Sequence, residues 1–383
     1  MKNFIVVNRN FNIPLASVLY KTSPLDMKVI LIHFNYGDEY NWPKPKSINK
    51  YFTDKDIKNC KNFFGDDFIV VENVNDYKKL VDGSNLCISL GRELFIFKQN
   101  SNKNVAMSGM RDYFPRYISL IDYYENYNVV LDSPSWLSKE ELKTNEFEIS
   151  DTEYDIVDEH KEIFKFVDPL NEYKNILSGI GVNNIRNEFG INHDSKVALV
   201  SLRRADDWHT IYQSDDEFYE TSLNTLKKFK DEGYFIICRR RVGLDDVNNR
   251  RHNSAENLKY NEFKKYIDLE ISDWGGYPDV LFKLCYLADI MLLMDTSNIA
   301  SKEGAICELP VYMPYDENNY FFQNQVKRWN PATKDMINFN VMTNDLSDDF
   351  FNNFSNNIND FNDKWHYGNI DNFWNLIEDM DNE

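Results

Sequence analysis

Residues 288–316 read ADIMLLMDTSNIASKEGAICELPVYMPYD, and this stretch decides the fold of the chain. The apolar run at 290–294 has the length and composition of a buried strand. Residues 301–307 have helical character, and a second strand-like run occupies 310–313. A strand, a helix and a strand at this spacing indicate a βαβ unit, whose strands lie parallel in one sheet.

The same alternation runs along the rest of the chain. Continuous runs of β-branched and other apolar residues, separated by polar connections, favour parallel strands that are covered on both faces. In the first half such runs occupy 4–7, 29–32, 68–71, 86–89, 105–108 and 129–131. In the second half they occupy 196–201 and 234–238, with helical spacing at 217–229, 260–267 and 279–287. The sequence therefore predicts an α/β protein with parallel sheets.

The bulk composition bounds the architecture and the partners. A chain of 383 residues, 42% of them hydrophobic, exceeds one typical core, which predicts two domains. The net charge of −19 repels nucleic-acid phosphates, so a nucleic acid is disfavoured as a partner. Five cysteines without a CxxC pair predict reduced thiols rather than a disulfide or zinc framework.

No stretch of the sequence approaches the roughly 20 apolar residues that cross a bilayer. The apolar run near the N-terminus is also too short for a signal peptide. We therefore expect a cytoplasmic protein without a transmembrane segment, with a peripheral position at the inner face of the membrane as an alternative. The sequence does not indicate an oligomeric state.

Small polar residues follow the apolar run at 290–294. Thr296, Ser297 and Asn298 could present hydroxyl and backbone N–H groups to a diphosphate at the start of the next helix. Glu303 lies further into that helix and could accept hydrogen bonds from ribose hydroxyls. The alternative is an ordinary helix cap followed by a solvated glutamate.

Arginines follow two of the other predicted strands. Arg203 comes just after the run at 196–201, and Arg239, Arg240 and Arg241 come after the run at 234–238. Because parallel strands end at one edge of a sheet, both groups should face the crevice that holds Ser297. Guanidinium groups match phosphate oxygens and stay charged, so we expect phosphate binding there. Salt bridges to nearby aspartates are the alternative.

The order of these features resembles the donor-binding part of GT-B glycosyltransferases. An Ala-Asp pair precedes an apolar strand, then come Asp295-x-Ser297, a helix that contains Glu303, and Leu-Pro-Val-Tyr-Met-Pro at 309–314. The resemblance is to CDP-glycerol glycerophosphotransferases and to UDP-GlcNAc 2-epimerase-like proteins. Those families have a histidine-containing turn where this chain has Arg-Arg-Arg-Val at 239–242.

The resemblance implies a GT-B-like α/β fold. Two Rossmann-like domains with parallel sheets would face a cleft, and C-terminal helices would pack back on the first domain. The expected boundaries are an acceptor-side domain at 1–165, a nucleotide-donor domain at 166–340 and C-terminal helices at 341–383. Phe350, Phe354, Ile358 and Phe361 recur at helical spacing in the last of these segments.

The resemblance also places an acceptor-activating base in the first domain. Asp112, in the loop after the run at 105–108, is one candidate, and His33, after the run at 29–32, is the other. A carboxylate can take a hydroxyl proton where burial raises its pKa. Arg111 and His209 are expected to contact the acceptor or a phosphate. A turn aspartate that caps a helix, and structural histidines, are the alternatives.

The function implied is transfer of a sugar, or of a polyol phosphate, from a nucleotide-activated donor to an acceptor hydroxyl. Such an enzyme would serve polysaccharide or cell-surface polymer synthesis, with a carbohydrate or lipid-linked acceptor. The donor nucleotide sugar is a substrate, and no tightly bound cofactor or metal is expected. Two alternatives stay open: a sugar-nucleotide 2-epimerase, and a degenerate GT-B module that acts as a binding or scaffold subunit.

Overall fold

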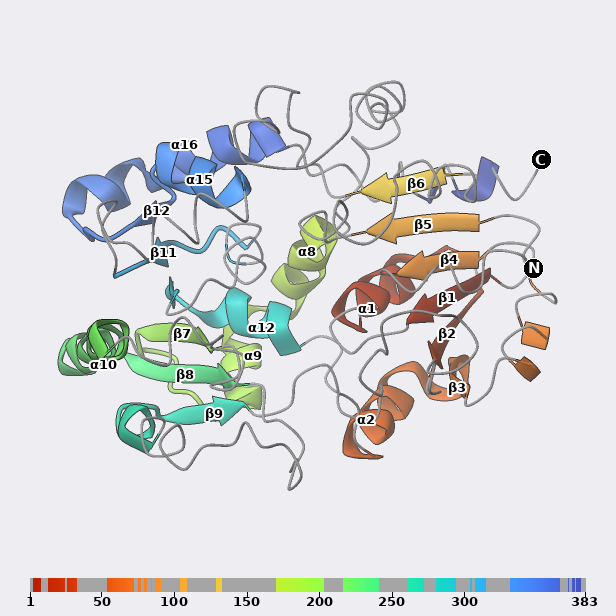
Figure 1. Cartoon of the computed structure of the whole chain (residues 1–383), viewed down its shortest axis with the longest axis horizontal. Helices are drawn as coiled ribbons and strands as arrows, with labels where there is room; N and C mark the ends of the chain where they lie inside the picture. Colours follow the sequence, from red (N-terminus) through yellow and green to blue (C-terminus); the bar gives the residue numbers. More distant parts are fainter. Residues whose placement is uncertain are drawn as a thin grey trace. The chain divides into compact units, whose positions relative to one another are not determined.

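The structure is a computed structural model of the whole chain (Figure 1). The chain divides into two compact units, which are described separately. Unit 1 comprises Met1–Tyr173, Gly275–Asp279 and Trp365–Glu383, and unit 2 comprises Lys174–Trp274 and Val280–Lys364. The structure describes residues 3–7, 13–24, 26–32, 54–71, 75–76, 79–80, 84, 87–90, 104–108, 129–132, 170–202, 216–240, 261–271, 280–293, 304, 307–314, 331–365, 371, 374–375 and 377–379.

Unit 1 contains a six-stranded parallel sheet in the order β3-β2-β1-β4-β5-β6. Its described helices include α1 (Ile13–Thr22) and α2 (Asp54–Phe64), and a short 3-10 helix, η3 (Gly65–Asp67), leads from α2 into β3. The strands are β1 (Asn3–Val7), β2 (Met27–Ile32), β3 (Phe68–Val71), β4 (Cys87–Leu90), β5 (Asn104–Ser108) and β6 (Val129–Asp132).

An aromatic cluster joins α1 to the α2–β3 connection in unit 1. The Phe64 ring packs edge-on against Tyr20 at 5.1 Å and stacks on Phe68 at 5.8 Å, both measured between ring centroids. The Tyr20 hydroxyl donates a hydrogen bond to the carboxylate of Asp67 at 2.8 Å. Burial, together with this aspartate, raises the pKa of Tyr20, so its phenol stays protonated and serves as a structural donor.

Unit 2 contains a second six-stranded parallel sheet, in the order β12-β11-β10-β7-β8-β9. Its described helices include α8 (Leu170–Ile180), which begins in unit 1, α9 (Val182–Glu188), α10 (Asp216–Asp231), α12 (Val280–Leu287), α15 (Pro331–Asn338) and α16 (Asp348–Trp365). Its strands are β7 (Val197–Leu202), β8 (Phe235–Arg240), β9 (Leu269–Ile271), β10 (Ile290–Leu292), β11 (Val311–Tyr312) and β12 (Met342–Thr343).

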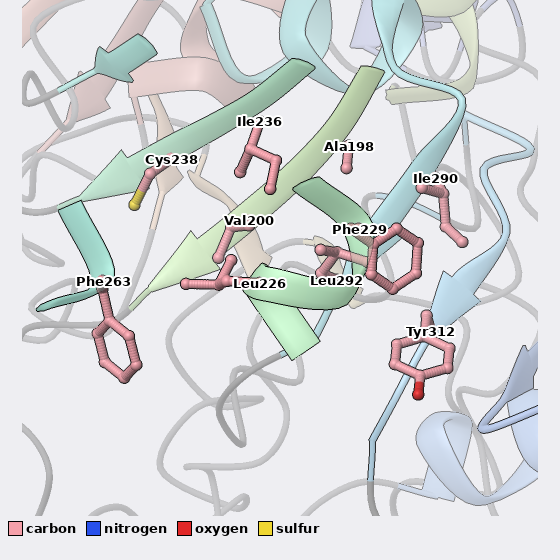
Figure 2. Packing of buried hydrophobic residues seen from close by; sticks show 10 residues of the cluster. All are labelled: Ala198, Val200, Leu226, Phe229, Ile236, Cys238, Phe263, Ile290, Leu292 and Tyr312. Atoms are coloured by element: carbon pink, nitrogen blue, oxygen red, sulfur yellow. The ribbon is translucent and has the colours of Figure 1, made fainter. Parts of the chain in front are cut away.

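One face of the unit 2 sheet packs on α10. Figure 2 shows alternate residues of β7, β8 and β10 with Leu226 and Phe229 of that helix. Phe229 is fully buried, and its ring lies 5.1 Å from Tyr234 and 5.2 Å from Tyr312 between centroids. The period-two alternation of strand side chains brings these residues to one face. The cluster contains Ala198, Val200, Leu226, Phe229, Ile236, Cys238, Phe263, Ile290, Leu292 and Tyr312.

Met291 in β10 and Val311 in β11 alternate with the residues of this cluster, so their side chains belong to the opposite face of the sheet. Gly304 is helical and lies against this face: a Cβ placed on it would meet the Sδ and Cε atoms of Met291 at 3.1 Å and Val311 at 3.6 Å. The absence of a side chain thus lets the helix that contains Gly304, here called the Gly304 helix, approach the sheet closely. Unit 2 is therefore covered on both faces, as its continuous apolar strands predicted.

Four helices of unit 2 end in the same way before the next strand. In each, one residue adopts a left-handed conformation: Gly190 (φ 69°), Gly233 (φ 85°), Glu308 (φ 55°) and Asn340 (φ 53°). The next residue donates its N–H five positions back, to Arg186, Phe229, Gly304 and Met336 respectively, over 2.7 to 3.0 Å. This is the Schellman arrangement, which satisfies carbonyls at helix ends and turns the chain towards the sheet.

The C-terminal region divides between the two units. In α16, Phe361 packs 6.2 Å from Phe339 between ring centroids, within unit 2. Trp374 belongs to unit 1, where its indole N–H donates to the hydroxyl of Thr22 in α1 at 3.1 Å. The predicted α/β class with parallel sheets is confirmed. Of the C-terminal segment at 341–383 that was expected to pack back on the first domain, only Trp365–Glu383 belongs to unit 1, because α16 up to Lys364 packs within unit 2.

Candidate functional site

Both sheets have the same strand order, and it contains a reversal. In unit 2 the chain runs outward from β7 through β8 to β9, then returns to the other side of β7 and continues through β10, β11 and β12. The reversal in unit 1 lies between β1 and β4. In open parallel sheets, ligands bind outside the carboxyl ends of the two strands that flank such a switch point. The carboxyl ends of β7 and β10, with the adjacent β8, therefore form the candidate site.

The register of the ladder aligns these three strands. Val200 in β7 pairs with Leu292 in β10 and with Cys238 in β8. Counted from this level, Arg203, Asp295 and Arg241 each stand three residues further along the chain. The predicted site residues therefore come at the same distance along the chain from three residues that pair side by side in the sheet.

The second strand differs from its prediction. We expected it to end at Cys238, with three arginines in the turn beyond, but β8 continues to Arg240. Arg239 pairs with Ser201 in β7 and Ile271 in β9, and Arg240 pairs with Leu202. The strand extends because both neighbours continue the ladder, which the apolar pattern does not reveal. The side chain of Arg239 is only 6% exposed and has at least one interaction partner.

The remaining predicted site residues lie outside the described residues, although the elements that precede them are described. Gly304, beside Glu303 in the sequence, is buried in the Gly304 helix. The undescribed residues are Arg203, His209, Arg241, Thr296, Ser297, Asn298 and Glu303 in unit 2, and His33, Arg111 and Asp112 in unit 1.

The opposite, amino-terminal edge of the unit 2 sheet holds two polar contacts that the sequence analysis missed. In each, here called a clip, an aspartate before one strand forms hydrogen bonds with the backbone of the neighbouring strand. Asp289, just before β10, accepts the Val197 N–H at 2.6 Å on its carboxylate, and its own N–H donates to the Val197 carbonyl at 2.8 Å. Asp268, just before β9, accepts the Ile236 N–H on its carboxylate at 2.8 Å, and its own N–H donates to the Ile236 carbonyl at 2.9 Å. An aspartate directly before an apolar run was the available signal. Asp289 thus serves the fold, at the end of β10 far from the candidate site.

A cation supports each clip. Lys230 contacts both carboxylate oxygens of Asp268, at 2.5 and 2.6 Å. Arg186 in α9 is 8% exposed and lies 3.4 Å from the Asp289 carboxylate. Its guanidinium also donates to three backbone carbonyls, those of His193 at 2.5 Å, Ser195 at 3.1 Å and Leu287 at 3.2 Å. These arginine contacts are structural, because they hold the ends of α9 and α12 to the sheet.

Two tyrosines of unit 2, Tyr312 and Tyr234, are not candidates for a base. Burial, and then the nearby Glu232 carboxylate, raises the pKa of Tyr312, and burial likewise raises the pKa of Tyr234. Their phenols are therefore protonated at neutral pH. Within the described ranges, no group of three His, Cys, Asp or Glu residues could hold a metal ion. Among the same residues, no helix has the length and apolar character to cross a membrane.

Comparison with known proteins identifies the fold. No family model and no curated protein matches the sequence. Solved structures do match along almost the full chain. The UDP-GlcNAc 2-epimerase of Neisseria meningitidis has a TM-score of 0.53 and 11% identity, with 99% of both chains covered. The UDP-GlcNAc 2-epimerase of Methanocaldococcus jannaschii has a TM-score of 0.51 and 12% identity, with 100% of both chains covered.

A polymerase matches in the same way. The wall teichoic acid polymerase TagF has a TM-score of 0.51 and 13% identity, over 99% of this chain and 88% of the polymerase chain. These structures share the GT-B fold, and the two parallel sheets found here agree with it. The resemblance inferred from residues 288–316 is therefore confirmed at the level of the fold: this chain has the GT-B fold.

Proposed function

We propose that this chain is a nucleotide-sugar-dependent glycosyltransferase of the GT-B type. It transfers a sugar, or a polyol phosphate, from the nucleotide to an acceptor hydroxyl in the synthesis of a glycan or cell-surface polymer. The acceptor is a carbohydrate or a lipid-linked saccharide. A protein that acts in the cytoplasm, or at the inner face of the membrane, has access to such substrates.

One observation carries the proposal. The strands that precede Arg203 and the Thr296–Ser297–Asn298 segment, β7 and β10, are hydrogen-bonded neighbours at the switch point of the unit 2 sheet. This is the position where nucleotides bind in sheets of this order. A cationic group and a hydroxyl-rich segment at adjacent strand ends suit a diphosphate.

Each donor-side residue has a proposed role. Arg203 and Arg241 neutralise the leaving diphosphate, and charge neutralisation at this point lowers the barrier to departure without a metal ion. Thr296, Ser297 and Asn298 bind the diphosphate through hydroxyl, amide and backbone donors, and Glu303 accepts hydrogen bonds from the ribose. Arg239 and Arg240, as the last residues of β8, support the same edge of the sheet.

The acceptor-side roles fall on unit 1. Asp112 or His33 takes the proton from the acceptor hydroxyl, which attacks the anomeric carbon or the phosphorus atom as the nucleotide leaves. Arg111 and His209 contact the acceptor or a phosphate. The strands that precede His33 and the Arg111–Asp112 pair, β2 and β5, both belong to the unit 1 sheet.

A 2-epimerase is the second candidate, because two of the matching structures are UDP-GlcNAc 2-epimerases and one of them is bound to UDP-GlcNAc. An epimerase converts its nucleotide sugar without an acceptor, whereas a transferase releases the nucleotide only when an acceptor is present. A binding or scaffold module would do neither.

A panel of nucleotide sugars separates these candidates. The purified chain is incubated with UDP-, GDP-, CMP- and CDP-activated donors, with and without saccharide acceptors, and the free nucleotide is measured. Acceptor-dependent release supports transfer, and interconversion without acceptor supports epimerisation. If no nucleotide or nucleotide sugar binds, both enzyme candidates are excluded. Activity that survives EDTA would support metal-independent transfer.

Substitutions then test the donor site. Arg203→Ala and Ser297→Ala should each lower kcat/KM by about 10²- to 10³-fold, as loss of a group that stabilises developing charge does. Lys227→Ala is the matched control, since Lys227 is an exposed cation on α10 and its loss should leave kcat/KM unchanged. Equal kcat/KM for Arg203→Ala and Lys227→Ala would exclude Arg203 from the donor site.

A further inference from the structure

Gly304 lies closer to the unit 2 sheet than a residue with a side chain could. A Cβ atom at this position would meet the Sδ and Cε atoms of Met291 at 3.1 Å, below the roughly 3.5–4.0 Å of an ordinary carbon contact. Met291 and Val311 are both fully buried, and close-packed neighbours of this kind leave little room for an added methyl group. If residue 304 carried a side chain, either Met291 or the Gly304 helix would have to shift by a few tenths of an ångström.

The backbone of Gly304 is held to the same strand by hydrogen bonds. The Leu309 N–H donates to the Gly304 carbonyl at 2.9 Å. The next residue, Pro310, accepts the Met291 N–H on its carbonyl at 2.8 Å. Gly304 and Met291 are thus joined twice, by direct packing and through the backbone of Leu309 and Pro310. Because the two connections act together, they fix the distance between the Gly304 helix and β10.

This fixed point directly adjoins a residue of the proposed donor site, because Glu303 precedes Gly304 in the sequence. Consecutive Cα atoms are held about 3.8 Å apart by a planar peptide unit, so a shift of the Gly304 backbone reaches Glu303 through one rigid link. A hydrogen bond from a ribose hydroxyl to a carboxylate spans about 2.5–3.0 Å and weakens as its geometry departs from the optimum. A displacement of a few tenths of an ångström is therefore large enough to weaken it.

We propose that Gly304 is a positioning residue for Glu303. Its close contact with Met291 sets the distance of Glu303 from the sheet, and this distance gives the donor site its preference for a ribonucleotide. The proposal rests on the proposed donor site, in which Glu303 accepts hydrogen bonds from the ribose. Gly304 has no side chain with which to bind the nucleotide, so its contribution is to keep the Glu303 carboxylate within reach of the 2′-hydroxyl.

Binding of ribo- and deoxyribonucleotides tests the proposal. Calorimetry gives dissociation constants for UDP and 2′-deoxy-UDP, and for CDP and 2′-deoxy-CDP in parallel. In the native chain the ribonucleotide should bind about tenfold more tightly, the scale of one hydrogen bond to a charged group. Glu303→Ala should abolish this preference. Gly304→Ala should reduce it to about threefold or less and leave the affinity for the deoxyribonucleotide within about twofold of the native value.

A second substitution tests the cause of that loss. Met291→Val removes the Sδ and Cε atoms that the added methyl group would meet, and keeps a residue suited to a strand. Alone it should lower the Tm, because it leaves a cavity, without changing the ribonucleotide preference. Combined with Gly304→Ala it should restore the preference to within about twofold of the native value.

Gly179→Ala is the matched control. It makes the same substitution inside helix α8, where a Cβ would meet no atom within 4 Å, and it should leave the preference unchanged. A native preference that persists in Gly304→Ala overturns the proposal and leaves the donor site standing. A loss that Met291→Val does not reverse also overturns it, since contact with Met291 would not be the cause.

Two results in the native chain reach further. If it binds the ribo- and deoxyribonucleotide equally well, Glu303 does not hold the ribose, and the positioning role of Gly304 is overturned while the diphosphate contacts stand. If neither UDP nor CDP binds the native chain, the donor site and the positioning role are both overturned.

Discussion

Arg186 is a buried cation whose contribution to stability can be worked from its contacts. Its guanidinium donates to three backbone carbonyls and lies 3.4 Å from the Asp289 carboxylate, and the residue is 8% exposed. Arg186→Met keeps much of the packing but leaves those acceptors without their donor. Removal of one member of a buried charged network typically costs about 3–5 kcal/mol.

Two features favour the lower end of that range. The Asp289 side chain is 49% exposed and can regain water, and the Nε atom of Arg186 has no hydrogen-bond partner in the native chain. We therefore expect Arg186→Met to lower the free energy of unfolding by about 3 kcal/mol, equivalent to a Tm decrease of roughly 6–12 °C for a unit of this size.

Urea denaturation followed by circular dichroism measures the change, and hydrogen exchange of the β7 and β8 amides assigns it to unit 2. The matched control is Glu188→Gln, which removes the similarly exposed ion pair between α9 and Lys283 of α12 and leaves the contacts of Arg186 in place. That change should cost less than about 1 kcal/mol. A loss of under 1 kcal/mol in Arg186→Met, or equal losses in the two variants, would refute the assignment of Arg186 as the main polar anchor of this edge.

Three further predictions concern the core, the backbone and the pH. Phe229→Ala, which empties the centre of the cluster in Figure 2, should lower the free energy of unfolding by about 3–5 kcal/mol in urea denaturation, and a loss below 1 kcal/mol would contradict the packing. A Cβ at Gly179 or Gly190 would meet no atom within 4 Å, so backbone conformation decides whether alanine raises or lowers the free energy of unfolding. Gly179→Ala, inside helix α8, should raise it by about 0.5–1 kcal/mol. Gly190→Ala, at φ 69°, should lower it by about 1 kcal/mol. Because the folded state raises the pKa of Tyr312, its unfolded form loses the proton first, and the free energy of unfolding should fall as the pH rises above about 10. Tyr312→Phe should flatten that fall, and an unchanged slope would show that Tyr312 does not contribute.

The sequence predicted the strands that lie in continuous apolar runs, and missed those that depend on pairing. The runs that became β3 and β10 are continuously apolar, with both end residues of β3 and all of β10 buried, so composition alone indicates them. Leu269–Ile271 and Met342–Thr343 are edge strands of three and two residues, and their extended form is set by the neighbouring strand rather than by their own composition.

The candidate site was predictable in its layout but not in its details. The position of Arg203 and Ser297 after neighbouring strands followed from the βαβ pattern, since parallel strands end at one edge. The burial of Arg239 did not follow, because a charged residue after an apolar run marks a strand end unless both neighbours extend the ladder. The roles of Asp289 and Arg186 depend on contacts about 100 residues apart in sequence, which no local pattern reveals.

The clips at Asp268 and Asp289 place much of the sheet's polar anchoring at the end of each strand that lies away from the candidate site. The residues that stabilise the sheet and the residues of the candidate site thus lie in different segments of the same chain. Unit 2 should accept transplanted segments: the residues after Leu202, Arg240 and Leu292 can be exchanged for those of another GT-B protein while the anchors stay in place. Natural divergence has the same freedom, so related chains can change the residues beyond these strands without a new fold.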